Sequence, residues 1–203
     1  MSGVDRPNDK LKVVGWIKEL IPTLKSSYSN GTETDSQLTE SEILVYNDAV
    51  AALASGTKGV LYGVVVISGT GMIVVGYASD NVTNARSGGW GPLLGDEGSG
   101  YAIGFDILKS VVRYSDGTGT PTSLKDAVLN NLNLNNASDL IGWAYKDSFA
   151  WKQFADLAPL ATSCAKNGDN VSIQILENAA LNLVVKYIVI TLNINIISFL
   201  EQY

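Results

Sequence analysis

Residues 60–75 read Val60-Leu-Tyr-Gly-Val-Val-Val-Ile-Ser-Gly-Thr-Gly-Met-Ile-Val-Val. Two apolar runs, rich in β-branched side chains, are separated in this stretch by the short turn Ser68-Gly-Thr-Gly. β-Branched residues favour strands, and glycine tolerates the backbone angles that a tight turn needs. The stretch therefore predicts a β-hairpin.

The turn Ser68-Gly-Thr-Gly is also a candidate phosphate site. A glycine-rich backbone exposes N–H groups that can bind phosphate oxygens, and the Thr70 hydroxyl adds a donor. The alternative is that the glycines serve turn geometry alone. The spacing matches neither the dinucleotide pattern G-x-G-x-x-G nor the P-loop ending Gly-Lys-Ser/Thr, so neither of those folds is predicted.

A carboxylate lies at a predicted strand-to-helix junction before the hairpin. Residues 43–46 form a short apolar run that predicts a strand, which leads through Asn47 and Asp48 into an alanine-rich helix over 49–55. Ligands of open α/β sheets collect beyond the carboxyl ends of the strands, so Asp48 is a candidate general base. The alternative is that Asp48 is the N-cap of the helix.

The segment Gly88-Gly-Trp-Gly-Pro-Leu-Leu-Gly-Asp-Glu-Gly-Ser-Gly follows the hairpin and holds six glycines in thirteen residues. Glycines cost conformational entropy, so this density indicates that the backbone must approach a ligand or another segment closely. A tryptophan face beside a carboxylate suits a sugar, because the ring stacks on C–H groups and the acid accepts hydroxyl donors. Trp90 and the adjacent carboxylates Asp96 and Glu97 are therefore candidates for binding a sugar, and a merely flexible loop is the alternative.

The other segments predict mainly helices. We expect them over residues 11–24 (ended by Pro22), 101–114, 123–132, 138–145, 148–166 and 171–187. A polar loop is expected over 26–40 and an isoleucine-rich strand after Tyr187. Polar residues within 179–200 argue against a membrane helix. Strands precede helices, so the fold class is α/β or α+β.

Composition excludes several classes of function. Fourteen Lys and Arg against twenty Asp and Glu give a net charge of −6, which offers no basic surface for nucleic acid. There is no His, so His-based triads and nearly all zinc sites are excluded. The single Cys164 fits a buried thiol in a reducing compartment, and the polar N-terminus shows no signal sequence, so we expect a cytoplasmic protein without membrane or nucleic-acid partners.

Three segments in this order resemble the N-acetylglucosamine kinases of the BadF/BadG/BcrA/BcrD ATPase family, in the actin, sugar kinase and Hsp70 superfamily. They are Asn47-Asp-Ala-Val-Ala-Ala-Leu-Ala-Ser-Gly-Thr, Ile67-Ser-Gly-Thr-Gly and Gly88-Gly-Trp-Gly-Pro-Leu-Leu-Gly-Asp-Glu-Gly-Ser-Gly-Tyr. The similarity continues to about Lys186. It implies an α/β, ribonuclease H-like (actin-like ATPase) fold, incomplete here and with a helical second half.

The resemblance also implies a function: ATP-dependent phosphorylation of N-acetyl-D-glucosamine at the 6-hydroxyl, with Mg²⁺. Asp48 would take the proton of that hydroxyl. The nucleotide would lie at Gly69, Thr70, Gly71 and Ala155, and the sugar at Asp48, Gly89, Trp90, Gly91 and Asp96. No protein ligand to the metal is assigned, and a homodimer is compatible with the family.

The chain also departs from the family pattern. It lacks the first phosphate loop, Asp-Gly-Gly-Gly-Thr, and the glycine-rich adenosine motif, so we expect a fragment of such a kinase. Its predicted parts are the end of an N-terminal domain (1–55), a C-terminal domain (56–190) and a divergent tail (191–203). The alternative function is an inactive sugar-binding or interaction remnant. An ATPase activator of a radical dehydratase is disfavoured, because its iron–sulfur cluster needs more cysteines than Cys164.

Overall fold

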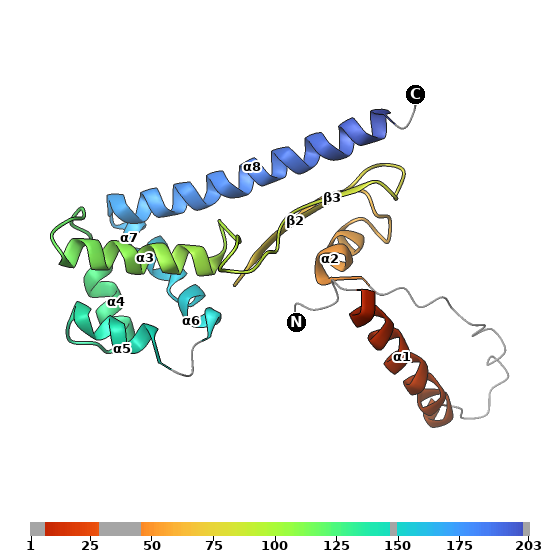
Figure 1. The fold of residues 1–203 in the computed structure, drawn as a ribbon, viewed down its shortest axis with the longest axis horizontal. Helices are drawn as coiled ribbons and strands as arrows, with labels where there is room; N and C mark the ends of the chain where they lie inside the picture. The colour runs from red at the N-terminus through yellow and green to blue at the C-terminus, as the bar shows by residue number, and fades with distance from the viewer. Residues whose placement is uncertain (1–6, 29–45, 147–149, 201–203) are drawn as a thin grey trace. The chain divides into compact units, whose positions relative to one another are not determined.

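The computed structural model describes residues 7–28, 46–146 and 150–200 (Figure 1). The chain forms two compact units, Met1–Gly59 and Val60–Tyr203. The helices described in the first unit are α1 (Pro7–Tyr28) and α2 (Asp48–Gly56). Helix α1 continues past Pro22, so the predicted end at that residue is wrong. A proline removes one backbone donor, and here the helix tolerates this loss.

Two predictions fall largely outside the described residues: the strand at residues 43–46 and the loop at 26–40. The first part of that loop, up to Tyr28, belongs to helix α1. The assignment of the two units to kinase domains stays a prediction.

The second unit contains a three-stranded antiparallel sheet in the order β1-β2-β3. The predicted hairpin is confirmed as β1 (Gly63–Ser68) and β2 (Met72–Tyr77), with Val65 opposite Val75 in the register. β3 (Asn84–Gly88) was not predicted, because its residues Asn84-Ala-Arg-Ser-Gly show no apolar run. It pairs with β2 along one edge of the sheet, where polar side chains are tolerated.

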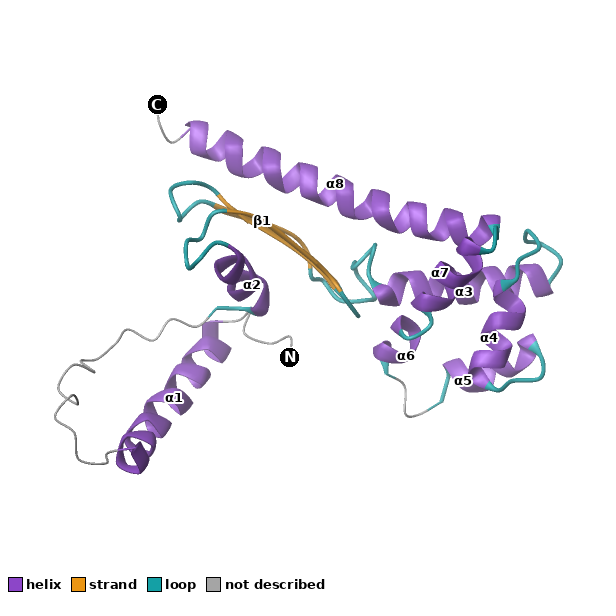
Figure 2. Cartoon of the chain, turned by 180° about the vertical axis from the view of Figure 1, so that it is seen from behind, coloured by secondary structure: helices purple, strands orange, loops and turns teal. Residues whose placement is uncertain are grey.

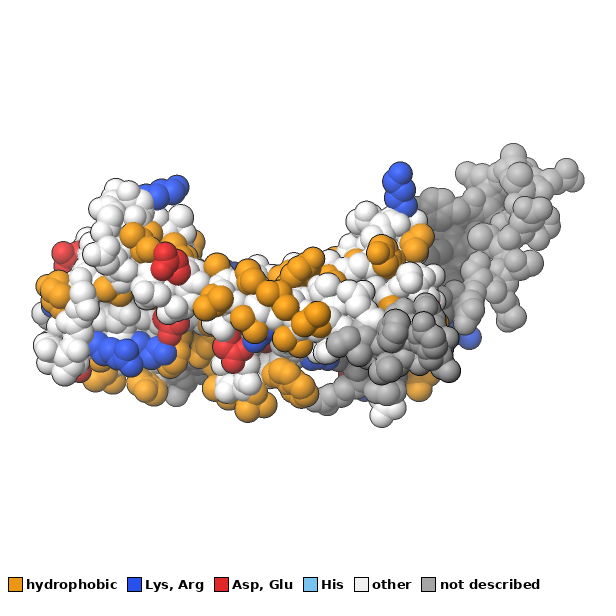
Figure 3. All heavy atoms as spheres, turned by 90° about the horizontal axis from the view of Figure 1, so that it is seen from above, with side chains coloured by type: hydrophobic (Ala, Val, Ile, Leu, Met, Phe, Trp, Pro, Cys, Tyr) orange, Lys and Arg blue, Asp and Glu red, His pale blue; other side chains and the backbone are white. Residues whose placement is uncertain are grey.

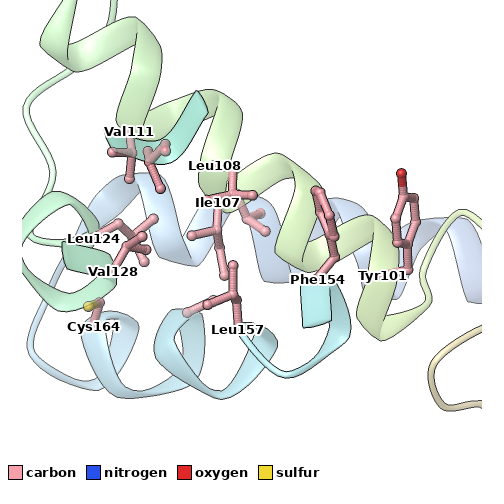
Figure 4. Packing of buried hydrophobic residues seen from close by; sticks show 12 residues of the cluster. Tyr101, Ile107, Leu108, Val111, Leu124, Val128, Phe154, Leu157 and Cys164 are labelled. Atoms are coloured by element: carbon pink, nitrogen blue, oxygen red, sulfur yellow. The ribbon is translucent and has the colours of Figure 1, made fainter. Parts of the chain in front are cut away.

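The helical second half packs around one apolar core (Figure 4). Its helices are α3 (Gly100–Ser115), α4 (Leu124–Leu132), α5 (Leu140–Ala144), α6 (Trp151–Ala155) and α7 (Ala158–Lys166), with a short 3₁₀ turn at Ala137–Asp139 before α5. Ile107, Leu124 and Leu157 are among its fully buried side chains, and Cys164 is a buried free thiol, as predicted. The helix predicted over 148–166 is two helices, because Pro159 lies in the first turn of α7 and has no backbone N–H to continue the hydrogen bonds of α6.

Helix α8 (Asn170–Leu200) runs along both the helical group and the sheet (Figures 1 and 2). The strand predicted after Tyr187 is therefore wrong. Ile190 and Ile194 are buried at helical spacing, and Ile190 packs with Met72 and Val74 of β2. At Gly76 of β2, a Cβ atom would lie 2.5 Å from Ile190 Cγ2, so glycine allows α8 to lie close to the sheet. The α/β class and the helical second half are confirmed, and the ribonuclease H-like arrangement stays a prediction.

Candidate functional site

The β1–β2 turn lies open to solvent. Gly69 N–H donates to the carbonyl of Gly71 at 2.9 Å and closes the turn, while Gly69 and Thr70 are exposed at its tip. The hydroxyl of Ser68 donates to the carbonyl of Gly98 at 2.8 Å and ties the turn to the glycine-dense segment. An accessible backbone and a threonine hydroxyl are the features that a phosphate-binding turn requires.

The start of helix α3 is bonded to this turn. Gly100 N–H donates to the carbonyl of Gly69 at 2.8 Å, and Tyr101 N–H donates to the carbonyl of Thr70 at 3.2 Å. Ser99 caps the helix by accepting a hydrogen bond from Ala102 N–H at 3.1 Å. These helix-terminal donors are therefore used within the protein. A phosphate at this place would be bound by the turn rather than by the end of α3.

Asp96 is the buried carboxylate of the site. It is 4% exposed and has a left-handed backbone, φ +64°. A Cβ atom at Gly71 would lie 2.8 Å from Asp96 Oδ2, so the carboxylate lies directly against the turn. Its Oδ1 has no hydrogen-bond partner among the described residues. A buried acceptor without a donor is costly, so this oxygen is suited to a donor from a ligand.

The loop that follows β3 is fixed by its own hydrogen bonds. Gly89 N–H donates to the carbonyl of Met72 at 2.7 Å, and Arg86 donates to the carbonyls of Gly88 (3.2 Å) and Gly89 (2.7 Å). The Arg86 guanidinium lies 5.7 Å from the centroid of the Trp90 ring, which is a cation–π distance. Trp90 is 69% exposed. The loop backbone is thus fixed by hydrogen bonds while the Trp90 ring is open to solvent. These hydrogen bonds argue against the alternative of a merely flexible loop.

The other glycines of this loop serve different needs. Gly91 has φ +84° and nothing near its would-be Cβ, so it is required by backbone conformation alone. Gly98 combines φ +89° with a would-be Cβ 2.9 Å from the carbonyl oxygen of Ala179 in α8. A Cβ at Gly100 would lie 3.3 Å from Ala155 Cβ, which places Ala155 beside the start of α3.

Asp48 belongs to the first unit, whereas the other predicted site residues belong to the second. It is exposed and is the first residue of α2. Asn47, not Asp48, is the N-cap, since its side chain accepts a hydrogen bond from Val50 N–H at 3.0 Å. The capping alternative for Asp48 is therefore wrong, and its role as a base stays a prediction.

The structure brings Gly69, Thr70, Gly71, Asp96 and Ala155 together around the start of α3. Two contributors were missed by sequence reasoning. Ser99 is fully buried and caps α3, and a serine just before a helix, here two residues before the predicted start at Tyr101, is an N-cap signal. Arg86 supports the Trp90 loop from a strand that the sequence did not reveal.

A small pocket of about 210 Å³ lies between the glycine-dense loop, α3 and α8. Glu97, Asp106, Asn178 and Asn182 contribute its polar lining, and Phe105 is among its apolar residues. Lys186 donates to Glu97 at 2.8 Å, and this hydrogen bond lowers the pKa of the Glu97 carboxyl. The pocket is below the size of a usual ligand cavity, so the open turn beside Asp96 is the better candidate site.

The model of the BadF/BadG/BcrA/BcrD ATPase family matches residues 23–196 of the chain. Over 181 residues the chain is 47% identical to the N-acetyl-D-glucosamine kinase of Dictyostelium discoideum, covering 89% of this chain and 51% of that protein. It is 42% identical over 142 residues to the N-acetylmuramic acid/N-acetylglucosamine kinase of Clostridium acetobutylicum, covering 70% of this chain and 46% of that protein. The chain therefore spans about half the length of these curated relatives.

The fold is also similar to the crystal structure of a presumed N-acetylglucosamine kinase from Chromobacterium violaceum. The TM-score is 0.62 at 28% sequence identity, and the match covers 69% of this chain and 47% of that chain.

Proposed function

Since this chain belongs to the BadF/BadG/BcrA/BcrD ATPase family, we propose that it phosphorylates N-acetyl-D-glucosamine at the 6-hydroxyl with ATP. The curated relatives carry the names of N-acetylglucosamine kinases. The observation that carries the proposal is the buried Asp96 carboxylate, which lies against the open turn with one oxygen unpartnered. A sugar hydroxyl supplies the donor that this oxygen lacks.

The residues divide into three tasks. Asp96 accepts a hydrogen bond from a sugar hydroxyl. Trp90, which is exposed between Gly89 and Gly91, stacks a face of its ring on the C–H groups of the sugar. The turn holds phosphate oxygens through the backbone N–H groups of Thr70 and Gly71 and the Thr70 hydroxyl, because the Gly69 N–H already closes the turn, and Ala155 lies beside the nucleotide. Asp48 takes the proton of the 6-hydroxyl as that oxygen attacks the γ-phosphorus and the bond to ADP breaks.

Mg²⁺ belongs to this proposal as an ion carried mainly by the nucleotide. No group of three or more Cys, Asp or Glu side chains that could hold a metal occurs among the described residues. Mg²⁺ commonly keeps water and phosphate ligands, and the Thr70 hydroxyl is the protein oxygen that the turn could add. When bound, the ion offsets negative charge on the phosphates during transfer.

ADP release in the presence of N-acetylglucosamine tests the proposal. We expect turnover by the unaltered chain, a loss of about 10²- to 10⁴-fold in Asp48→Asn with sugar binding retained, and loss of sugar binding in Asp96→Asn. Asp126→Asn is the matched control: it makes the same substitution at an exposed residue of α4, and its turnover and sugar binding should equal those of the unaltered chain. Sugar-dependent thermal stabilisation without turnover would instead support the inactive sugar-binding alternative. If the chain showed no turnover and no stabilisation by the sugar, both functions would be refuted.

A further inference from the structure

Helix α8 is apolar over most of its length, and its sequence holds one basic residue, Lys186. Hydrophobic side chains gather along the middle of the helix in Figure 3, and residues 170–195 are long and apolar enough to cross a membrane. Lys186 Nζ nevertheless donates to Glu97 Oε2 at 2.8 Å. The Lys186 side chain is only 18% exposed, so its charge depends on this carboxylate for compensation. The ion pair commits this side of α8 to contact with the glycine-dense loop.

The residue after Glu97 is held by the same face of α8. A Cβ atom at Gly98 would lie 2.9 Å from the carbonyl oxygen of Ala179 and 2.9 Å from Leu183 Cγ, so the loop backbone lies directly against the helix. Ala179, Leu183 and Lys186 are separated by four and then three residues, and such positions are neighbours on one helix face. This face therefore contacts two consecutive residues of the loop.

Asp96 lies directly before these two residues and needs such support. Its left-handed backbone, φ +64°, is uncommon for a residue with a side chain, and it persists where the surrounding structure imposes it. Its Oδ1 has no hydrogen-bond partner among the described residues, so no bond to that oxygen holds the carboxylate in place. The position of Asp96 thus depends on how the following residues are anchored.

We propose that Glu97 and Lys186 are positioning residues of the sugar site, and that their ion pair fixes Asp96 where its Oδ1 can accept the sugar hydroxyl. This inference rests on the proposed function, and it gives α8 a part in sugar binding. The pair contributes little to overall stability, because Glu97 is 54% exposed and exposed ion pairs are weak. Its effect is local: without the pair, residue 96 can leave its left-handed conformation.

Direct contact with the sugar is the other role that the Glu97 carboxylate could have. Exchanging the two charges, Glu97→Lys together with Lys186→Glu, separates the two roles. The exchange restores an ion pair of opposite polarity, but it removes the carboxylate from position 97. Sugar affinity therefore returns if the pair positions Asp96, and it stays lost if Glu97 binds the sugar itself.

Carbodiimide labelling of the carboxyls, without any ligand, tests whether the pair holds Asp96. At 4% exposure, Asp96 should be protected in the unaltered chain. Lys186→Met and Glu97→Gln should each raise its labelling at least about 5-fold through local opening, and the charge exchange should restore the protection. Mass spectrometry locates the label, and exposed Asp126 of α4 should be labelled equally in every sample. Unchanged labelling of Asp96 in both single variants would overturn the proposal.

Calorimetric titration with N-acetylglucosamine measures the consequence for the site. Each single variant should raise the Kd for the sugar about 5- to 30-fold, and the exchange should return it to within about 3-fold of the unaltered value. The Tm of each ligand-free variant should stay within about 2 °C of the unaltered chain, since the pair is largely exposed.

Lys109→Met is the matched control for the titration. It removes an ion pair of similar length, 2.7 Å to Asp106, from the surface of α3, and should leave the Kd unchanged. Weaker sugar binding accompanied by a fall in Tm of more than about 5 °C, or a charge exchange that restores nothing, would contradict the positioning role. If the unaltered chain bound no sugar, the proposed function would fail, and the labelling would still decide whether the pair holds Asp96.

Discussion

Gly71 and Gly69 occupy the same turn, yet the structure requires glycine at only one of them. Neither has a left-handed backbone. A Cβ atom at Gly71 would meet Asp96 Oδ2 at 2.8 Å, whereas a Cβ at Gly69 would meet nothing within 4 Å. The requirement at Gly71 is therefore steric and comes from the buried carboxylate.

This difference predicts unequal effects of one methyl group. Gly71→Ala should lower the free energy of unfolding by about 1–3 kcal/mol, because Asp96 is too buried to move freely. Gly69→Ala should change it by less than about 1 kcal/mol, and a small gain is expected from the stiffer unfolded chain. Urea denaturation of both variants measures the difference. Equal effects would mean that Asp96 does not lie against the turn.

The sequence made Gly71 a candidate through the turn Ser68-Gly-Thr-Gly, and it made Trp90 and Asp96 candidates through the glycines that surround an aromatic residue and a carboxylate. It could not identify which glycine makes room for Asp96. That contact joins residues far apart in the chain, and only the packing of the hairpin against the start of α3 creates it. Arg86 was hidden for a similar reason, since its strand is defined by pairing with β2 rather than by its own residues.

At the scale of elements, the C-terminal part of α8 shows that the secondary-structure preference of a segment's residues can be overridden by packing. Residues 188–194 are rich in isoleucine, which favours strands, so the sequence predicted a strand. The segment lies over the sheet instead, and Ile190 and Ile194 face it from one side of a helix. Tertiary packing overrides the local preference here, because a helix can bury both side chains against β2 without leaving backbone groups unpaired.

The packing of α8 on β2 predicts a large effect at Ile190. Its side chain is 1% exposed, so Ile190→Ala should cost about 2–5 kcal/mol of unfolding free energy through the cavity that it leaves. Ile141→Ala makes the same chemical change at an exposed position of α5 and should cost less than about 1 kcal/mol. Thermal or urea unfolding compares the two. A similar small cost at both positions would contradict the helical packing of this segment.

At the scale of the whole molecule, the chain has no His, so the pH dependence of its unfolding free energy depends on other titratable groups. Among the residues that the structure describes, three carboxyls have lowered pKa values. Hydrogen bonds from Thr83 and its neighbours act at Asp80, and the hydrogen bond from Lys186 acts at Glu97. At Asp169, burial opposes ionisation, but hydrogen bonds from Ser172, Ser123 and Thr122 outweigh it and lower the pKa to about 2. Burial raises the pKa of Tyr101 above 10.0.

These shifts predict a plateau of stability across neutral pH. A carboxyl with a lowered folded pKa contributes stability above its unfolded pKa, and this contribution is lost as the pH falls through the folded value. The raised pKa of Tyr101 acts in the opposite direction: its contribution is complete below the unfolded pKa and is lost as the pH rises through the folded one. We therefore expect a nearly constant unfolding free energy from about pH 5.5 to 8, a decline below about pH 4.5, and a second decline above about pH 10.

Urea denaturation followed by tryptophan fluorescence measures the unfolding free energy at each pH, and Asp169→Asn should make its decline at acid pH less steep. A slope between pH 6 and 7 would contradict this account, because the chain has no His to produce one.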